Sequence, residues 1–251
     1  MAPNLLILGG TTEASALCAE LAAREVRGTL SLAGRVARPK RQPLPMRVGG
    51  FGGVAGLVSY LRTEAITHVI DATHPFAAQM SAHAVAACTA VGVPLAALVR
   101  PAWTPQPGDD WRHVPDIAGA VAALAGPAQR VMLAVGRLHL AAFAPQPQHH
   151  YLLRLVDPPE GDLPLPNATV IVDRGPFTED GDRVLMQAHG IQMVVSKNAG
   201  GSGAVAKIAA ARALRLPVLM IDRPAVPARH EVRSVAEALD WLTAHGADLG
   251  V

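Results

Sequence analysis

Short aliphatic runs alternate with alanine-rich segments of helical length along most of the chain, and this alternation constrains the fold more than any other feature. In the first hundred residues it predicts strands at 4–8, 29–33, 46–48, 68–71 and 94–99, with helices at 12–23, 54–62 and 77–91. Half of the residues are hydrophobic but only 4% are aromatic, so aliphatic side chains must fill the core. Such runs are typical of buried parallel strands joined by right-handed helical crossovers.

A proline-rich segment at 100–108 interrupts the pattern, and we expect a domain boundary there. The alternation then resumes, with strands predicted at 130–135, 151–156, 168–172, 193–196 and 217–221, and helices at 116–125, 179–188, 204–215 and 235–244. The sequence therefore predicts an α/β protein of two Rossmann-like parallel-sheet domains, residues 1–99 and 109–251. Because ligands bind at the carboxyl ends of such strands, we expect the active site in the cleft between the domains.

The bulk properties exclude several classes of protein. The formal net charge is only +2, and no long block of like charge suggests a nucleic-acid surface. Both cysteines lie in alanine-rich helical segments, and no CxxC or HExxH pattern occurs, so no metal site is predicted. No signal peptide precedes the first strand, and the longest apolar stretch is broken by Gly92 and Pro94. We expect a cytoplasmic protein that binds neither nucleic acid nor a membrane.

A glycine-containing turn follows the first predicted strand and opens the first helix, at the position of a dinucleotide-binding fingerprint. Its sequence over residues 9–14 is Gly-Gly-Thr-Thr-Glu-Ala. Gly9 and Gly10 permit a tight turn, and the free N–H groups of the helix start, with the hydroxyls of Thr11 and Thr12, suit a pyrophosphate. Glu13 is assigned to backbone or ribose contacts. An ordinary turn between a strand and a helix remains the alternative.

Basic residues follow the second predicted strand, where NAD-binding folds place a carboxylate. Arg35 is the first of them, and Arg38, Lys40 and Arg41 come close behind. A cation there suits the 2′-phosphate of NADP, although a solvated basic loop is the alternative. A second glycine-rich turn at 49–53 includes Gly52 and allows close approach of a flat ligand such as adenine. Residues 1–99 are thus the expected NADP-binding domain.

The string Asp-Ala-Thr-His-Pro-Phe-Ala at 71–77, taken with residues 9–14, resembles the precorrin-6A reductase family of cobalamin biosynthesis. In the second half, Arg-Gly-Pro-Phe at 174–177, Ser-Lys-Asn-Ala-Gly-Gly at 196–201 and Lys207 follow in the order of that family. The resemblance extends from residue 4 to about residue 224. Ala199 and Arg137 depart from the family's pattern.

The resemblance implies that NADPH delivers a hydride to a ring double bond of precorrin-6A, giving precorrin-6B without a metal or flavin. Cofactor contacts are then expected from eight residues: Gly9, Gly10, Thr11, Thr12, Glu13, Arg35, Gly52 and Thr73. Substrate contacts are expected from ten: Asp71, His74, Phe76, Arg174, Ser196, Lys197, Asn198, Gly200, Gly201 and Lys207. His74 and Lys197 are the candidate catalytic residues, and the proton donor is one of them, water or a substrate carboxyl group.

Other functions are compatible with parts of the sequence. A tetrapyrrole methyltransferase using S-adenosylmethionine would share the first turn, but the basic end of the second strand disfavours it. A non-enzymatic NADP-binding sensor would need no motif such as residues 196–201. A short-chain dehydrogenase is excluded, because neither Tyr60 nor Tyr151 is followed by lysine four residues later. The expected partner is the tetrapyrrole substrate, with transient contact to neighbouring enzymes of the pathway.

Overall fold

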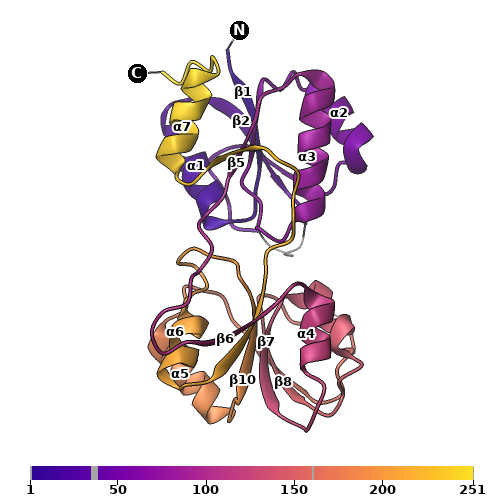
Figure 1. Ribbon diagram of the computed structural model, residues 1–251. Coiled ribbons are helices and arrows are strands. Elements are labelled where there is room, and N and C mark those ends of the chain that lie inside the picture. Colours follow the sequence, from indigo (N-terminus) through magenta and orange to yellow (C-terminus); the bar gives the residue numbers. More distant parts are fainter. Residues whose placement is uncertain (1, 35–38, 160, 251) are drawn as a thin grey trace. The chain divides into compact units, whose positions relative to one another are not determined.

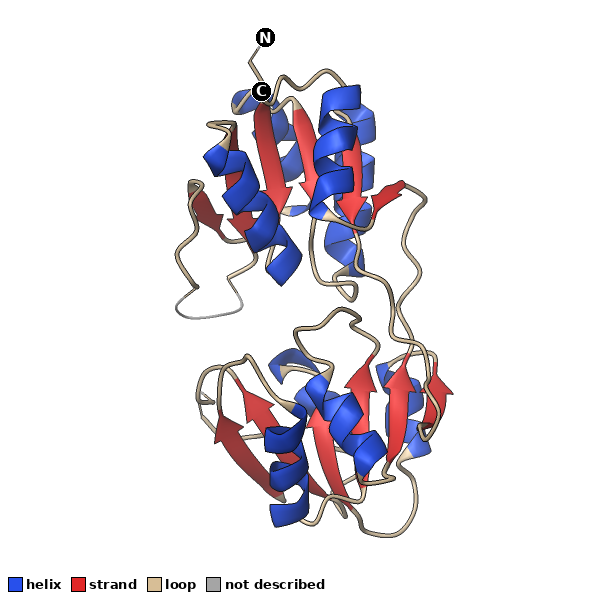
Figure 2. Cartoon of the chain, turned by 90° about the vertical axis from the view of Figure 1, so that its left-hand side faces the viewer, coloured by secondary structure: helices blue, strands red, loops and turns tan. Residues whose placement is uncertain are grey.

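The structure is a computed structural model that describes residues 2–34, 39–159 and 161–250. The chain divides into two compact units, each containing a six-stranded parallel sheet with helices on its faces (Figures 1 and 2). Unit 1 combines Met1–Pro101 with Ala225–Val251, and unit 2 comprises Ala102–Pro224. The predicted fold class of two parallel-sheet α/β domains is therefore confirmed.

In unit 1 the strand order is β12-β5-β4-β1-β2-β3, and every neighbouring pair is parallel. Its strands are β1 (Asn4–Leu8), β2 (Arg27–Leu32), β3 (Met46–Val48), β4 (His68–Asp71), β5 (Leu95–Leu98) and β12 (His230–Val232). Its helices are α1 (Thr12–Ala23), α2 (Gly53–Thr63), α3 (Ala78–Val91) and α7 (Val235–Ala244). Because β2 and β4 flank β1, the sheet has a topological switch point at the carboxyl ends of β1 and β4.

The alternation of side chains along β1 divides the core of unit 1 into two layers. Leu5 and Ile7 pack with buried residues of α1 and α7 on one face of the sheet. Leu6 and Leu8 pack with α2 and α3 on the other face. Figure 1 shows these two pairs of helices on opposite sides of the sheet. Small residues such as Ala14 allow the helices to approach the strands closely, which explains why the chain needs few aromatic side chains.

Unit 2 has the strand order β6-β11-β10-β7-β8-β9, again with parallel neighbours. Its strands are β6 (Asp110–Val114), β7 (Arg130–Ala134), β8 (His150–Leu155), β9 (Ala168–Val172), β10 (Met193–Lys197) and β11 (Pro217–Ile221). Its helices are α4 (Ile117–Ala123), the short 3-10 helix η1 (Arg137–Phe143), α5 (Glu179–Ala188) and α6 (Ala206–Ala213). Helices α5 and α6 cover one face, and α4 lies on the other (Figure 1).

The structure differs from the sequence-based prediction at the end of the chain. Residues 225–251 were assigned to the second domain, but β12 pairs with β5 and α7 packs into the core of unit 1. Strands β6 and β12 were not predicted, because each is an edge strand with a single buried residue, Val114 or Val232. Neither strand therefore has the apolar run that marks an internal parallel strand. The first crossing between units, at Pro101 and Ala102, falls inside the expected boundary segment.

Polar side chains define where several helices begin. Four helices begin after a residue whose side chain accepts a hydrogen bond from a backbone N–H of the first turn. These residues are Thr11 before α1, Asp116 before α4, Thr178 before α5 and Ser234 before α7. In the part of the chain that the structure describes, no helix is both long enough and apolar enough to cross a bilayer.

Candidate functional site

The turn between β1 and α1 packs closely at its first position, which favours glycine there. A Cβ added at Gly9 would lie 2.4 Å from Leu30 Cδ1 and 3.3 Å from the Cβ of Ala14. Gly10 has a φ of +120°, and a Cβ built there would meet no atom within 4 Å, so its backbone faces open space. Thr11 Oγ1 accepts a bond from Ala14 N and donates to Ala72 O at 2.8 Å. The turn is thus held close to the sheet while its outer side stays accessible to a ligand.

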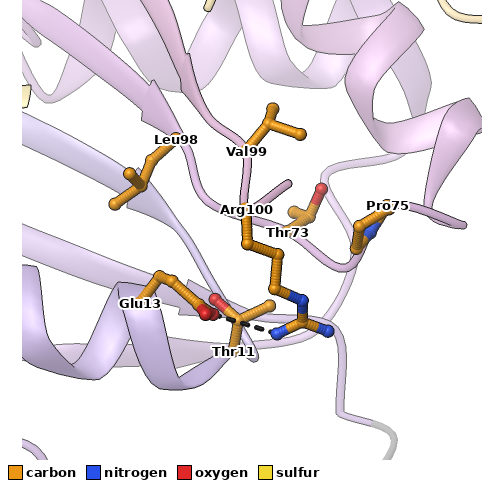
Figure 3. A pocket seen from close by; sticks show the side chains of 7 residues that line it. All are labelled: Thr11, Glu13, Thr73, Pro75, Leu98, Val99 and Arg100. Atoms are coloured by element: carbon orange, nitrogen blue, oxygen red, sulfur yellow. Dashed lines mark hydrogen bonds and ion pairs between the residues drawn. The ribbon is translucent and has the colours of Figure 1, made fainter. Parts of the chain in front are cut away.

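A small pocket lies at the topological switch point of unit 1, beside the carboxyl ends of β1, β4 and β5 (Figure 3). The residues that line it lie at the start of α1, in the loop after β4 and at the end of β5 with the residues that follow it: Thr11, Glu13, Thr73, Pro75, Leu98, Val99 and Arg100. Three of them, Thr11, Glu13 and Thr73, were predicted to contact the cofactor. The structure therefore brings together two segments that are about sixty residues apart in the sequence.

Two residues that line this pocket, Arg100 and Glu13, form an ion pair. Arg100 Nη1 donates to Glu13 Oε2 at 2.9 Å, and the two side chains are only 13% and 24% exposed. Burial raises the pKa of Glu13, but a backbone hydrogen bond and Arg100 outweigh this effect, so the pKa lies below its usual value. Glu13 is therefore ionised at neutral pH. Thr12 is exposed, and its hydroxyl donates to the same carboxylate at 3.1 Å.

Asp71 is buried beneath the loop that follows β4 rather than open to a ligand. Its Oδ1 accepts bonds from Thr73 N and from Thr73 Oγ1, at 3.1 and 2.7 Å. Its Oδ2 accepts from Ser81 Oγ at 2.6 Å and from Arg229 Nη1 at 3.0 Å. The Asp71 side chain is 1% exposed and that of Arg229 is 8% exposed. Asp71 therefore positions the loop that carries Thr73, and its carboxylate is already saturated by four donors.

His74 and Phe76 occupy the same loop and are half-buried. His74 Nδ1 accepts a hydrogen bond from Phe76 N at 3.2 Å, and the two rings are 5.8 Å apart. This bond makes Nδ1 the acceptor nitrogen, which leaves Nε2 as the nitrogen that carries the proton in the neutral ring. The backbone bond from Ala77 N to His74 O closes the turn into α3.

The glycine-rich turn after β3 also lies at the carboxyl edge of the sheet. Gly52 is exposed and has a φ of +80°, a left-handed conformation that glycine adopts without strain. Arg35, the predicted reader of the 2′-phosphate, lies outside the described residues, as does Arg38.

In unit 2, the residues after β10 fold into a loop held by Trp103. Asn198 Oδ1 accepts from Trp103 N at 2.8 Å, and Asn198 Nδ2 donates to Trp103 O at 3.0 Å. The indole Nε1 donates to Gly201 O at 2.7 Å. Gly200 and Gly201 both have positive φ, which the tight loop requires. Asn198 thus uses its amide to fix the loop, although the sequence suggested a direct substrate contact.

The other predicted substrate residues of unit 2 occupy different surroundings. Lys197 is half-buried at the end of β10, whereas Ser196 is fully buried and its hydroxyl donates to Lys197 O at 3.2 Å. Lys207 is 6% exposed, donates to Ala204 O at 2.7 Å and lies 5.0 Å above the ring of Trp103. Arg174 is exposed and pairs with Asp157. Of these two lysines, Lys197 therefore has the greater access to a ligand.

Three arginines near strand ends, whose side chains make defined contacts in the structure, were not predicted as site residues from the sequence. Arg100 was treated as part of the domain boundary, and Arg229 as part of the second domain. Arg223 donates from Nε to Asn198 O at 3.0 Å and from Nη2 to Ala199 O at 3.2 Å. An arginine two residues after the end of β5 and of β11 was the signal that could have found Arg100 and Arg223.

The cysteines and possible metal ligands add no chemistry to this site. Burial raises the pKa of Cys18 to about 11, and burial together with Asp71 raises that of Cys88 to about 12. Both thiols are therefore protonated at neutral pH and are poor nucleophiles. Within the described ranges no group of three His, Cys, Asp or Glu residues is placed to hold a metal ion.

Comparison with known proteins identifies the family to which the chain belongs. A sequence model of the family described as Precorrin-6x reductase CbiJ/CobK matches residues 4–243. The chain belongs to the precorrin-6x reductase family. This family member is 60% identical over 244 residues to the Precorrin-6A reductase of Rhodobacter capsulatus, with 97% of each chain covered. It is 45% identical over 246 residues to the Precorrin-6A reductase of a Sinorhizobium species, and this match covers 96% of this chain and 94% of the relative.

A solved structure has the same fold throughout. The structure named CobK precorrin-6A reductase superposes with a TM-score of 0.96 at 59% sequence identity, covering 99% of this chain and 100% of that chain. Membership of the precorrin-6x reductase family makes the protein an oxidoreductase of cobalamin biosynthesis, and it implies a nicotinamide cofactor. The alternatives of a methyltransferase and of a non-enzymatic sensor are thereby set aside.

Proposed function

We propose that this protein reduces precorrin-6A to precorrin-6B with NADPH as the hydride donor, in the cytoplasm. The observation that carries the proposal is the match over nearly the whole chain to relatives named for this reaction, at up to 60% identity. We also propose that the substrate ring carries no cobalt, because these relatives are named for the metal-free precorrin.

The first turn of unit 1 suits the cofactor in shape and chemistry. The open backbone at Gly10 and the N–H groups at the start of α1 form a cradle for a pyrophosphate. When bound, NADPH supplies the hydride. Thr11 acts mainly as the helix cap and as a link to the β4 loop, because its hydroxyl makes both internal bonds described above. Thr73 lines the adjoining pocket, where Asp71 fixes its hydroxyl.

We assign recognition of the substrate to residues at the carboxyl edge of the sheet in unit 2. Precorrin-6A carries several carboxylates, and the Lys197 ammonium at the end of β10 is a suitable partner for one of them. The bonds of Asn198 and Gly201 to Trp103 fix the loop that follows Lys197, and with it the backbone at this strand end. His74, with Nε2 protonated in the neutral ring, is the candidate proton donor.

An anaerobic assay tests the proposal. Addition of precorrin-6A should cause loss of NADPH absorbance and yield a product with two more hydrogens. Lys197→Ala should lower kcat/KM for precorrin-6A by roughly 10- to 100-fold, the scale of one partly desolvated charge pair that also orients the substrate. Its Kd for NADPH, measured by fluorescence, should stay unchanged.

Arg183→Ala is the matched control, because it also removes one positive charge from unit 2, from a side chain on α5 that is 43% exposed and pairs with Asp180. It should retain wild-type kinetics. Weaker NADPH binding with normal substrate kinetics in Lys197→Ala would contradict the assignment of Lys197 to the substrate. Absence of NADPH oxidation in the wild-type protein would contradict the proposed reaction itself.

A further inference from the structure

A guanidinium group is fixed at the carboxyl edge of β2 and β3. Arg47 is the central residue of β3 and pairs in register with Ser31 of β2. Its Nη1 donates to Ser31 Oγ at 2.7 Å and to Gly49 O at 3.0 Å, and its Nη2 donates to Gly50 O at 3.1 Å. Three bonds to two different segments hold the plane of the group in one orientation.

Aromatic rings support the same group. The Arg47 Cζ atom lies 3.8 Å from the centroid of the Phe51 ring and 5.2 Å from that of Tyr60. The two rings meet edge to face, with centroids 5.1 Å apart. Phe51 is itself fixed against α2, because a Cβ at Gly56 would lie 1.7 Å from Phe51 O, where only glycine fits. The guanidinium is therefore positioned before any ligand arrives, which lowers the entropy cost of binding.

The charge of Arg47 is not neutralised by the residues around it. Its three acceptors are a hydroxyl and two carbonyl oxygens, and no carboxylate pairs with it among the residues that the structure describes. Three of its five N–H donors are used in these bonds, so Nε–H and one Nη2–H are left for a ligand. The side chain is half-buried beside exposed Gly50 and Gly52. A partly desolvated cation with this geometry favours a bidentate oxyanion.

A chain of hydrogen bonds links this group to the cofactor turn. Ser31 Oγ accepts from Arg47, and Ser31 O accepts from Gly9 N at 2.9 Å. In dinucleotide-binding sheets the adenosine ribose lies at the end of the second strand, beside the glycine turn that holds the pyrophosphate. We propose that Arg47 binds the 2′-phosphate of NADPH and is the residue that selects NADPH over NADH. This inference rests on the proposed use of NADPH and transfers to β3 the role that the sequence suggested for Arg35.

Two adenine nucleotides test the site without requiring precorrin-6A. Adenosine 2′,5′-bisphosphate and 5′-AMP differ only in the 2′-phosphate, so the ratio of their Kd values by calorimetry reports this contact. The wild-type protein should prefer the bisphosphate, and Arg47→Gln should reduce the preference by roughly 10- to 100-fold, the scale of a charge-assisted phosphate contact. The Kd for 5′-AMP and for NADH should not change. Arg47→Lys should recover only part of the preference, because lysine keeps the charge but loses the planar pair of donors.

Arg62→Gln is the control, since it removes the same charge from an exposed position in the last turn of α2. It should keep the wild-type ratio. The preference should also fall below pH roughly 6, where the dianion of a phosphate monoester takes up a proton and loses one negative charge, and Arg47→Gln should flatten this dependence. Thermal unfolding and circular dichroism verify that the variants fold.

The outcomes separate this proposal from the proposed function. A wild-type ratio retained in both Arg47 variants overturns the role of Arg47 and places the phosphate contact elsewhere. Equal wild-type affinity for the two nucleotides overturns the proposed 2′-phosphate site. Reduction of precorrin-6A by the protein with NADH would, in that case, leave the proposed reductase activity intact.

Discussion

Asp71 illustrates how far a single residue can be interpreted without a structure. Its position as the last residue of an apolar strand indicated a place at the carboxyl edge of a parallel sheet, where the structure has it. Its carboxylate accepts a bond from Thr73 N and so orients the backbone of the loop, whereas the sequence suggested a direct contact with the substrate. The partner that decides its role, Arg229, lies 158 residues further along the chain, and no local pattern connects the two. The burial of this ion pair therefore could not be predicted from sequence.

Removal of this carboxylate should destabilise the protein. Asp71→Asn would leave the buried Arg229 guanidinium with only the exposed carboxylate of Glu231, 3.8 Å from its Nε, as a counter-ion, which should cost up to about 3–5 kcal/mol in the free energy of unfolding. Urea denaturation measures this change. The double variant Asp71→Asn with Arg229→Met should lose less than the sum of the two single variants, because the two residues are in direct contact. Normal stability with a raised KM for precorrin-6A would instead show that Asp71 contacts the substrate.

At the scale of elements, prediction succeeded where burial produced a clear periodicity. The internal strands β1 and β10 have four or more buried residues in succession, and their ranges were expected almost to the residue. Edge strands have no such run: β12 contains His230 and Glu231, both exposed, and is a strand only because β5 lies beside it. The candidate site residues show the same difference between local and long-range features. Their positions at strand ends were predictable, whereas partners supplied by distant segments, such as Arg100 for Glu13, were not.

Helix α7 should stabilise unit 1 despite its position at the end of the chain. Trp241 is 6% exposed within the core of that unit, and its ring stacks on His245 at 4.2 Å. Trp241→Ala should lower the free energy of unfolding by about 3–5 kcal/mol, as expected for deletion of a buried aromatic side chain. Asp240→Ala, at an exposed position on the same helix, should change it by less than about 0.5 kcal/mol. Equal effects of the two variants in urea denaturation would show that α7 is not part of the core.

At the scale of the whole molecule, the chain passes from unit 1 to unit 2 and back again. A cut in the first crossing segment should therefore not release the first hundred residues. The fragment that begins after the cut carries β12 and α7, which pair with and pack against the sheet of unit 1. A site-specific protease sequence inserted between the exposed residues Thr104 and Pro105 provides the test. After cleavage, the two fragments should co-elute in gel filtration and separate only in denaturant. Separation under native conditions would contradict the assignment of residues 225–251 to unit 1.

The return of the chain to its first sheet also imposes an order on biosynthesis. While the ribosome adds residues at roughly 5–20 per second, several seconds pass between the emergence of β5 and that of β12. Unit 2 is synthesised during this interval, while β5 remains an open edge whose neighbouring apolar side chains lack the cover of α7. The unit whose synthesis starts first is thus completed last, and the nascent N-terminal sheet keeps an unpaired strand edge until β12 is made.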